Sequence, residues 1–177
     1  TVVVRGVADS FDDGSQTSTI TIASDNSTSD GKYLLSALDN ATLTVVTLDN
    51  DTATVTIDNV SVSENATTAT MTLRLSNGVS DNFTVYVSTI DGTARSSQYD
   101  YTALSTQTVS FAGNDNETQS VSITLNDDSQ VEGSETLTLR MVSVSNSGVD
   151  ISDTGTLTIV DNDVVTVTIA DVSDSES

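Results

Sequence analysis

Hydrophobic and polar residues alternate with a period of two along most of the chain. The clearest runs are residues 69–75, where Ala, Met, Leu and Leu alternate with Thr, Thr and Arg, and residues 83–87, where Phe and two Val alternate with Thr and Tyr. This period is typical of antiparallel strands that bury one face. No stretch shows the period of a helix. The pattern predicts further strands near residues 54–62, 107–112, 118–125, 135–145 and 155–161.

Turn-forming clusters separate the predicted strands, for example residues 76–78 (Ser-Asn-Gly) and residues 113–116 (Gly-Asn-Asp-Asn). The adjacent apolar residues Met141 and Val142 interrupt the alternation. This interruption indicates either a β-bulge or a strand that is covered on both faces. Seven strands within roughly 110 residues predict an all-β sandwich of two antiparallel sheets.

Two sequence motifs occur twice in the chain. Residues 49–57 recur as residues 161–169 at an offset of 112, and residues 9–17 align with residues 128–136 at an offset of 119. Repetition at such spacings is typical of tandem copies of one domain. The first copy holds about seven more residues between the motifs, and we expect them in the loop of residues 24–32.

The repeated motifs divide the chain into three parts. They predict the C-terminal part of a preceding repeat in residues 1–51, a complete repeat in residues 52–163 and the first strand of a following repeat in residues 164–177. Both incomplete parts expose unpaired strand edges, so we expect neither to fold alone. Their missing strands would come from a longer chain or from an adjoining subunit that donates a strand.

Composition narrows the chemistry that is open to the chain. The 177 residues include no Cys and no His, and 57 of them are Ser or Thr. Disulfides, thiolate metal sites and histidine ligands are therefore excluded. The net charge is −21, from 26 acidic and 5 basic residues, which opposes binding to nucleic acid or to an anionic membrane. No apolar run is long enough for a membrane span, and the first residues do not resemble a signal peptide.

The acidic residues of the complete repeat gather in a few predicted turns. Alternate strands of a sandwich bring such turns to one pole, where the carboxylates would repel one another without a counter-ion. A divalent cation relieves this repulsion, and Ca²⁺ suits a wide cluster of carboxylates better than Mg²⁺, which requires a tighter octahedron. The candidate ligands are Glu64, Asp91, Asp127, Asp128, Glu132, Glu135, Asp161 and Asp163.

Several short motifs of the complete repeat follow one pattern. They are residues 60–65 (Val-Ser-Val-Ser-Glu-Asn), 91–94 (Asp-Gly-Thr-Ala), 99–101 (Tyr-Asp-Tyr), 109–111 (Val-Ser-Phe), the acidic run 127–135, and 156–163 (Thr-Leu-Thr-Ile-Val-Asp-Asn-Asp). In this pattern the chain resembles the Calx-beta domain family, as it occurs in large bacterial surface and adhesin proteins. The resemblance implies tandem immunoglobulin-like sandwiches of seven antiparallel strands.

The resemblance also implies a set of Ca²⁺ ligands. In calcium-binding members they come from the early Glu, the Asp-Gly-Thr-Ala turn, the acidic run and the terminal acidic triplet, which correspond to the eight residues named above. Ala8 and Gln16 replace two of these acids in the preceding repeat, so we expect that repeat to bind Ca²⁺ less tightly or to hold fewer ions. The candidates there are Asp9, Asp13, Asp49 and Asp51.

Some of these acids also have a structural interpretation. The Asp-Asn-Asp sequences at residues 49–51 and 161–163 could serve only as turns, since Asn and Asp favour turns. Their coincidence with the other acidic turns favours the ligand interpretation. Asp100 lies between two Tyr residues, and we predict that it is a structural hydrogen-bond acceptor rather than a ligand.

These observations favour a calcium-binding structural repeat of a long extracellular, adhesin-like or filament-forming protein in which Ca²⁺ stiffens the array. The expected partners are neighbouring repeats of the same chain, or identical subunits of a filament at the cell surface, with no insertion into the membrane. The alternative is a calcium-sensor domain that regulates a membrane protein. We expect no enzyme activity, because the predicted acids gather at a pole beside no recognisable substrate pocket.

Overall fold

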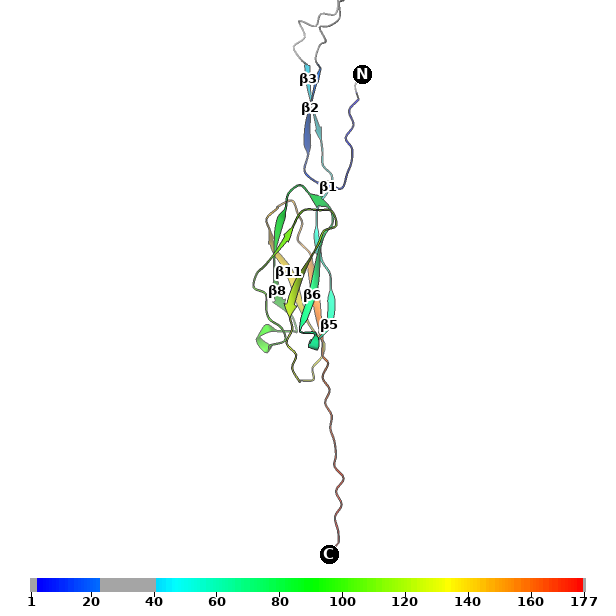
Figure 1. Cartoon of the computed structure of the whole chain (residues 1–177), viewed down its shortest axis with the longest axis vertical. Helices are drawn as coiled ribbons and strands as arrows, with labels where there is room; N and C mark the ends of the chain where they lie inside the picture. Colours follow the sequence, from blue (N-terminus) through cyan, green and yellow to red (C-terminus); the bar gives the residue numbers. More distant parts are fainter. Residues whose placement is uncertain (1–2, 23–40, 177) are drawn as a thin grey trace, which may run out of the picture.

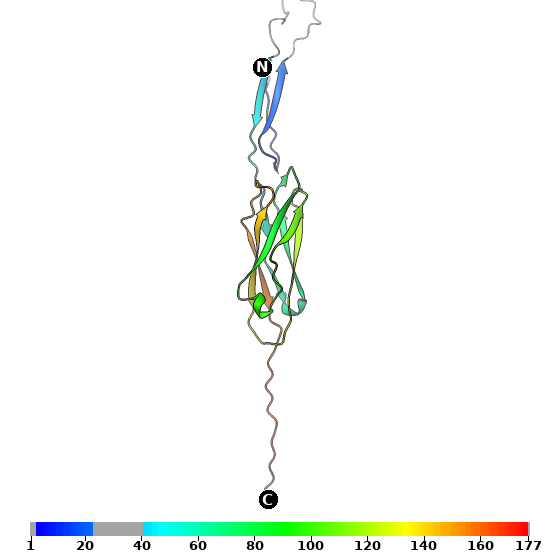
Figure 2. The same ribbon diagram turned by 90° about the vertical axis from the view of Figure 1, so that its left-hand side faces the viewer.

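The alternating segments pair into two sheets that pack face to face as a sandwich (Figures 1 and 2). The computed structural model describes residues 3–22 and 41–176. One sheet has the order β10 (Thr118–Thr124), β6 (Thr68–Leu75), β4 (Val55–Ile57). The other has the order β5 (Val60–Ser63), β12 (Thr154–Val160), β11 (Glu135–Val144), β8 (Phe83–Asp91), β9 (Gln107–Phe111). Neighbouring strands of these two sheets are antiparallel, except that β5 and β12 are parallel.

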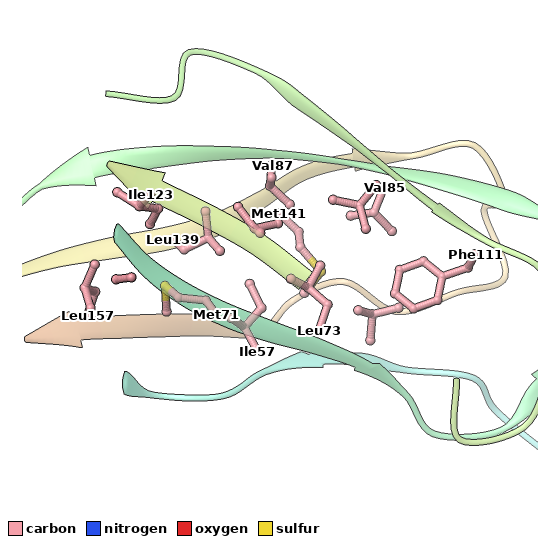
Figure 3. Close-up of a cluster of buried hydrophobic side chains, with 14 of the residues drawn as sticks. Ile57, Met71, Leu73, Val85, Val87, Phe111, Ile123, Leu139, Met141 and Leu157 are labelled. Carbon is pink, nitrogen blue, oxygen red and sulfur yellow. The ribbon is translucent and has the colours of Figure 1, made fainter. Parts of the chain in front are cut away.

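The apolar face of each long strand fills the space between the sheets (Figure 3). In β6, the four apolar residues from Ala69 to Leu75 are fully buried, while the Thr and Arg residues between them are exposed or half-buried. The rings of Phe83 and Phe111 stack across β8 and β9 with their centroids 5.1 Å apart. The period-two pattern therefore predicts the buried face correctly.

The segment predicted as one strand near residues 54–62 consists of two strands in different sheets, so the prediction of a single strand was wrong. The chain crosses from β4 to β5 at Asp58 and Asn59. The Asn59 side-chain Oδ1 accepts a hydrogen bond from the Thr156 backbone N–H at 2.7 Å. A side chain thus supplies a hydrogen bond beside the crossover, where the chain leaves the first sheet.

Strand β11 contains a bulge at the adjacent apolar pair. Its pairing with β8 shifts register between Met141 and Ser143. Val142 is 49% exposed, whereas Met141 is buried. The bulge interpretation is therefore confirmed, and coverage of the strand on both faces is not observed at Val142.

Two 3-10 helices lie in the loops of the sandwich, η2 (Glu64–Ala66) and η3 (Ser96–Gln98). A short strand, β7 (Gly78–Val79), lies in the turn between β6 and β8 and pairs in parallel with β1 (Phe11–Asp12). Among the residues that the structure describes, no helix is long and apolar enough to cross a membrane.

A β-hairpin of β2 (Gln16–Ile22) and β3 (Ala41–Thr47) precedes the sandwich. Gln16 pairs with Thr47, and Glu135 in β11 pairs with Ile159 in β12. The offset of 119 relates Gln16 to Glu135, and the offset of 112 relates Thr47 to Ile159, so the two pairs are equivalent. The hairpin therefore has the same register as β11 and β12, as two copies of one domain require. The extra loop expected at residues 24–32 lies outside the described residues.

The loops of the sandwich gather at two ends. The end that faces the hairpin, here the N-terminal pole, comprises residues 76–82, 112–117 and 145–153. The opposite end, the C-terminal pole, comprises residues 64–67, 91–106, 125–135 and 161–163 (Figure 1). Residues 164–176 continue beyond the C-terminal pole without forming a strand, and Val164 and Ile169 are exposed. The division into one complete and two partial repeats stays a prediction.

Candidate metal centre

Two groups of three carboxylates lie at the C-terminal pole. In each group, one carboxylate oxygen from every residue lies within 4.8 Å of the others. Six of the residues at this pole therefore converge closely enough to share cations. The first group is Glu64, Asp161 and Asp163, and the second is Asp100, Glu132 and Glu135.

The first group joins the start of the sandwich to its end. Glu64 is the first residue of η2 and is only 8% exposed. Asp161 and Asp163 follow β12 directly, and β12 lies beside β5, the strand that precedes Glu64. The Asp163 backbone N–H donates to Asp161 Oδ1 at 2.8 Å, which turns the chain so that both carboxylates approach Glu64. The parallel pairing of β5 with β12 thus places residues about one hundred positions apart at one point.

One oxygen of the first group has no partner. Asp163 Oδ2 is buried and accepts no hydrogen bond. Burial raises the pKa of Asp163 above its usual range, and the charges of Asp161, Asp127 and Asp128 raise it further. Burial likewise raises the pKa of Glu64, although the hydrogen bond from the Asp128 backbone N–H opposes this rise. The hydrogen-bond donors around the first group therefore balance only part of its negative charge.

The second group lies between the β10–β11 loop and the β8–β9 connection. Burial raises the pKa of Glu135 to about 7, and the neighbouring Asp100 carboxyl, with which it shares a hydrogen bond, adds to this rise. Burial also raises the pKa of Glu132, and the charges of Asp100, Asp128 and Asp161 contribute. The groups adjoin, because one small cleft is lined by Glu64 and Asp161 together with the three acids of the second group.

Asp100 belongs to the second group although the sequence predicted only a structural role for it. Its Oδ2 accepts a hydrogen bond from the Arg95 backbone N–H at 2.6 Å, which is the structural contact that was expected. Its carboxylate nevertheless lies within reach of Glu132 and Glu135. The position between Tyr99 and Tyr101 did not reveal this second contact, since it depends on a loop about thirty residues further along the chain.

Three of the predicted ligands lie at this pole but outside both groups. Asp91 Oδ1 accepts hydrogen bonds from the Tyr101 hydroxyl at 2.5 Å and from the Ser96 backbone N–H at 3.1 Å. The Tyr101 bond, more than any other contact, holds the pKa of Asp91 below its usual range. Asp128 is held in a similar way by Gln130, which donates from its backbone and its side chain. Asp127 raises the pKa of Glu64 and Asp163 through its charge.

The candidates of the preceding repeat lie at the N-terminal side of the sandwich. Asp49 Oδ2 accepts from the backbone N–H of Asp13 at 3.0 Å, and its Oδ1 accepts from Asp51 at 2.9 Å. Asp161 makes the equivalent bonds with Glu132 and Asp163. Asp49 and Asp161 thus accept equivalent hydrogen bonds in the two segments that the sequence motifs align.

Those four candidates do not converge as closely. Asp9 accepts the backbone N–H of Phe11 at 3.0 Å. Burial and the charges of Asp49, Asp9 and Asp12 raise the pKa of Asp51. Within the described residues, none of these four candidates belongs to a group of three residues whose carboxylate oxygens lie within 4.8 Å of one another.

Comparisons with known proteins identify a family and a fold. The model of the Calx-beta domain family matches residues 48–172. A search of curated protein sequences found no match.

Solved structures share the fold. The apo-form Calx CBD1 domain has a TM-score of 0.55 at 20% identity, covering 64% of this chain and 100% of that one. The calcium binding domain CBD12 of CALX1.1 has a TM-score of 0.54 at 22% identity, with coverages of 69% and 53%. The Calx CBD2 domain has a TM-score of 0.52 at 12% identity, with coverages of 62% and 86%. The chain thus spans about half the length of the CBD12 structure.

Proposed function

The chain belongs to the Calx-beta domain family, and we propose that its C-terminal pole binds Ca²⁺ as a structural part of an extended protein. Calx-beta domains are calcium-binding domains with regulatory or structural roles. The proposal assigns no catalytic step to the chain. The observation that carries it is the buried Asp163 Oδ2, which lacks a hydrogen bond and lies beside the carboxylates of Glu64 and Asp161.

The residues present fit a calcium ion. A buried carboxylate oxygen without a partner costs about 1–3 kcal/mol, and more when the group is charged. A hard cation with oxygen ligands removes this cost, and the first group offers three carboxylates from two segments of the chain, the turn after β5 and the turn after β12. The second group offers three more, and Asp127 and Asp128 add charge nearby. No Cys or His competes for a softer metal, since the chain contains neither.

Bound calcium would supply positive charge and would join separate segments of the chain through their carboxylates. The first group would tie the turn after β5 to the segment that leaves β12, and the second would tie the β10–β11 loop to the β8–β9 connection. Residues 127–134 form no strand and are held by hydrogen bonds from Asp128 to Glu64 and from Glu132 to Asp161, to which the ion would add. The ion would therefore stiffen the pole from which the chain continues as residues 164–176.

We place this domain in an extracellular array of repeats at a cell surface, either in one long adhesin-like chain or in a filament of identical subunits. The support is the repeated loop chemistry of Asp49 and Asp161, together with the shared register of the two hairpins. Only Asp51 and Thr52 separate Asn50 from the first residue of the buried core, so no flexible linker stands between the repeats. Extracellular modules bind Ca²⁺ at roughly 10⁻⁴ to 10⁻³ M.

A calcium sensor that regulates a membrane protein is the second candidate. The structural likeness to the Calx CBD domains favours it. Affinity separates the two, because sensors bind Ca²⁺ at roughly 10⁻⁷ to 10⁻⁵ M.

The test is calorimetric titration of Ca²⁺ into the metal-free chain. We expect binding in the millimolar to submillimolar range, together with a higher melting temperature, and loss of most of both effects in D163N. D115N is the matched control, because Asp115 is an exposed acid at the opposite pole. Equal melts in calcium and in chelator would remove the proposed function, and micromolar or tighter binding would favour the sensor.

A further inference from the structure

We propose that the turn of residues 76–79 is a docking platform for the preceding repeat, which holds it through Phe11 and Asp12 and so sets the angle between the two domains. The inference rests on the proposed array of repeats but requires no metal. Both sides of the contact are ordered by their own hydrogen bonds, and two side-chain contacts cross the junction beside the pairing of β1 with β7.

The platform is held rigidly by the sandwich. Gly78 and Val79 form β7 and are buried. The Val79 backbone N–H donates to the Gly113 carbonyl at 2.9 Å. Gly113 has a φ of 89°, and a Cβ there would lie 2.7 Å from the Val79 carbonyl oxygen, so only glycine permits this approach. The Glu117 carboxylate accepts the Gly113 N–H at 3.0 Å and fixes the loop.

The docking loop is also ordered. Asp9 Oδ1 accepts the Phe11 backbone N–H, and Asp49 Oδ2 accepts the backbone N–H of Asp13 and Gly14 at 3.0 and 2.7 Å. Phe11 and Asp12 form β1, which pairs in parallel with β7. The loop therefore presents a short strand to the platform.

The first contact across the junction is the ring of Phe11 on Gly78. The three heavy atoms nearest to a Cβ built on Gly78 would all be ring carbons of Phe11, none of them further than 3.0 Å away. A side chain at this position would therefore exclude the ring. Phe11 is 38% exposed, whereas Val7 in the same segment is 86% exposed, so the platform covers much of the ring.

The other contacts hold the start of the sandwich. Asp12 Oδ2 accepts the backbone N–H of Ala53, a fully buried residue, at 3.1 Å. The Asn77 side-chain amide donates to the Thr52 carbonyl at 2.8 Å. The turn that receives Phe11 thus also holds the chain where one repeat passes into the next.

This contact is specific to the junction. At the equivalent positions of the complete repeat stand Gln130 and Val131, which offer neither an aromatic ring nor a carboxylate. We therefore expect no dock of this kind after Asp163.

The test is nuclear magnetic resonance of the labelled 177-residue chain. In the wild type we expect nuclear Overhauser effects between the Phe11 ring and the Gly78 Hα protons, at both high and low protein concentration. G78A should lose these ring contacts and broaden the distance distribution in small-angle scattering. F11A should produce the same broadening without adding atoms to the platform. D12A should speed hydrogen exchange at the Ala53 amide.

G148A is the control, because Gly148 lies at the same pole and its added Cβ would meet only Asn146 Oδ1 at 3.4 Å. Absence of the Phe11–Gly78 effects in the wild type would overturn the dock, as would their persistence in G78A. Effects that appear only at high concentration would also overturn it, since they would indicate contact between copies. Calcium titration and the same spectra of the wild type separate the two proposals: docking in a chain that binds no Ca²⁺ refutes only the metal site, and Ca²⁺ binding without docking refutes only this inference. Docking should persist in D163N.

Discussion

Metal-free protein should become more stable as the pH falls from 7.5 to about 5, and Glu135 should account for most of the change. Its folded-state pKa of about 7 lies above the ordinary value of 4.5. Between these values the folded state binds more protons than the unfolded state, so stability is lost as the pH rises. The raised pKa values of Glu64 and Asp163 act in the same direction.

The size of the effect follows from the difference between the folded and ordinary pKa of Glu135. A difference of one in pKa corresponds to about 1.4 kcal/mol, and screening by solvent at this half-buried site reduces the total to roughly 1–2 kcal/mol. For a sandwich of this size that corresponds to a rise of roughly 4–15 °C in melting temperature. Below about pH 4 the trend should reverse, because Asp91 and Asp128 have lowered pKa values and their stabilisation is lost as they become protonated.

The assay is thermal unfolding, followed by circular dichroism, of protein freed of metal and kept in chelator. E135Q should be more stable than the wild type at pH 7.5 and nearly equal to it at pH 5, because it removes the titration. D115N should retain the wild-type dependence. With Ca²⁺ present the trend should flatten, since the ion competes with protons for the same carboxylates. A metal-free melting temperature that rises from pH 5 to 7.5, or an E135Q variant with the full pH dependence, would refute this reasoning.

Three further predictions concern the site and the hairpin. D163N should abolish most of the calcium-dependent rise in melting temperature while D115N retains it; an unchanged rise in D163N would contradict the assignment of the first group. Y101F should lower stability by about 1–3 kcal/mol equally in calcium and in chelator, because Asp91 loses the hydroxyl that binds it; a loss confined to calcium would instead make Asp91 a ligand. A peptide of residues 1–51 should show the poorly dispersed proton spectrum of an unfolded chain, since its hairpin lacks a second sheet; a dispersed spectrum would show that it folds alone.

The pattern of the sequence predicted most of the strands, and the division into repeats stays a prediction. Alternation identified the buried face of β6, because side-chain direction in a strand depends on local geometry. Its interruption at Met141 left a bulge and a strand covered on both faces open, and the structure shows the bulge. The offsets between repeated motifs predicted the shared register of the two hairpins. Acids placed in turns also pointed to one pole, since alternate turns of a sandwich lie at the same end.

Tertiary structure decided which of those acids meet. Asp91 and Asp100 lie in neighbouring turns of similar sequence character, yet the first is bound by Tyr101 and the second approaches Glu132 and Glu135. The difference arises from distances between segments far apart along the chain, which no local pattern records. The crossover from β4 to β5 at Asp58 likewise depends on contacts between distant segments and not on the local pattern.

The dock of Phe11 on Gly78 was likewise decided by the tertiary structure. In the sequence, Phe11 interrupts an acidic run and Gly78 belongs to an ordinary turn, so neither residue indicates the other. They meet where the loop before β2 lies against the turn between β6 and β8. The local pattern therefore determined most of the strands, and the packing of loops from distant parts of the chain determined the contacts that form the site and the junction between the hairpin and the sandwich.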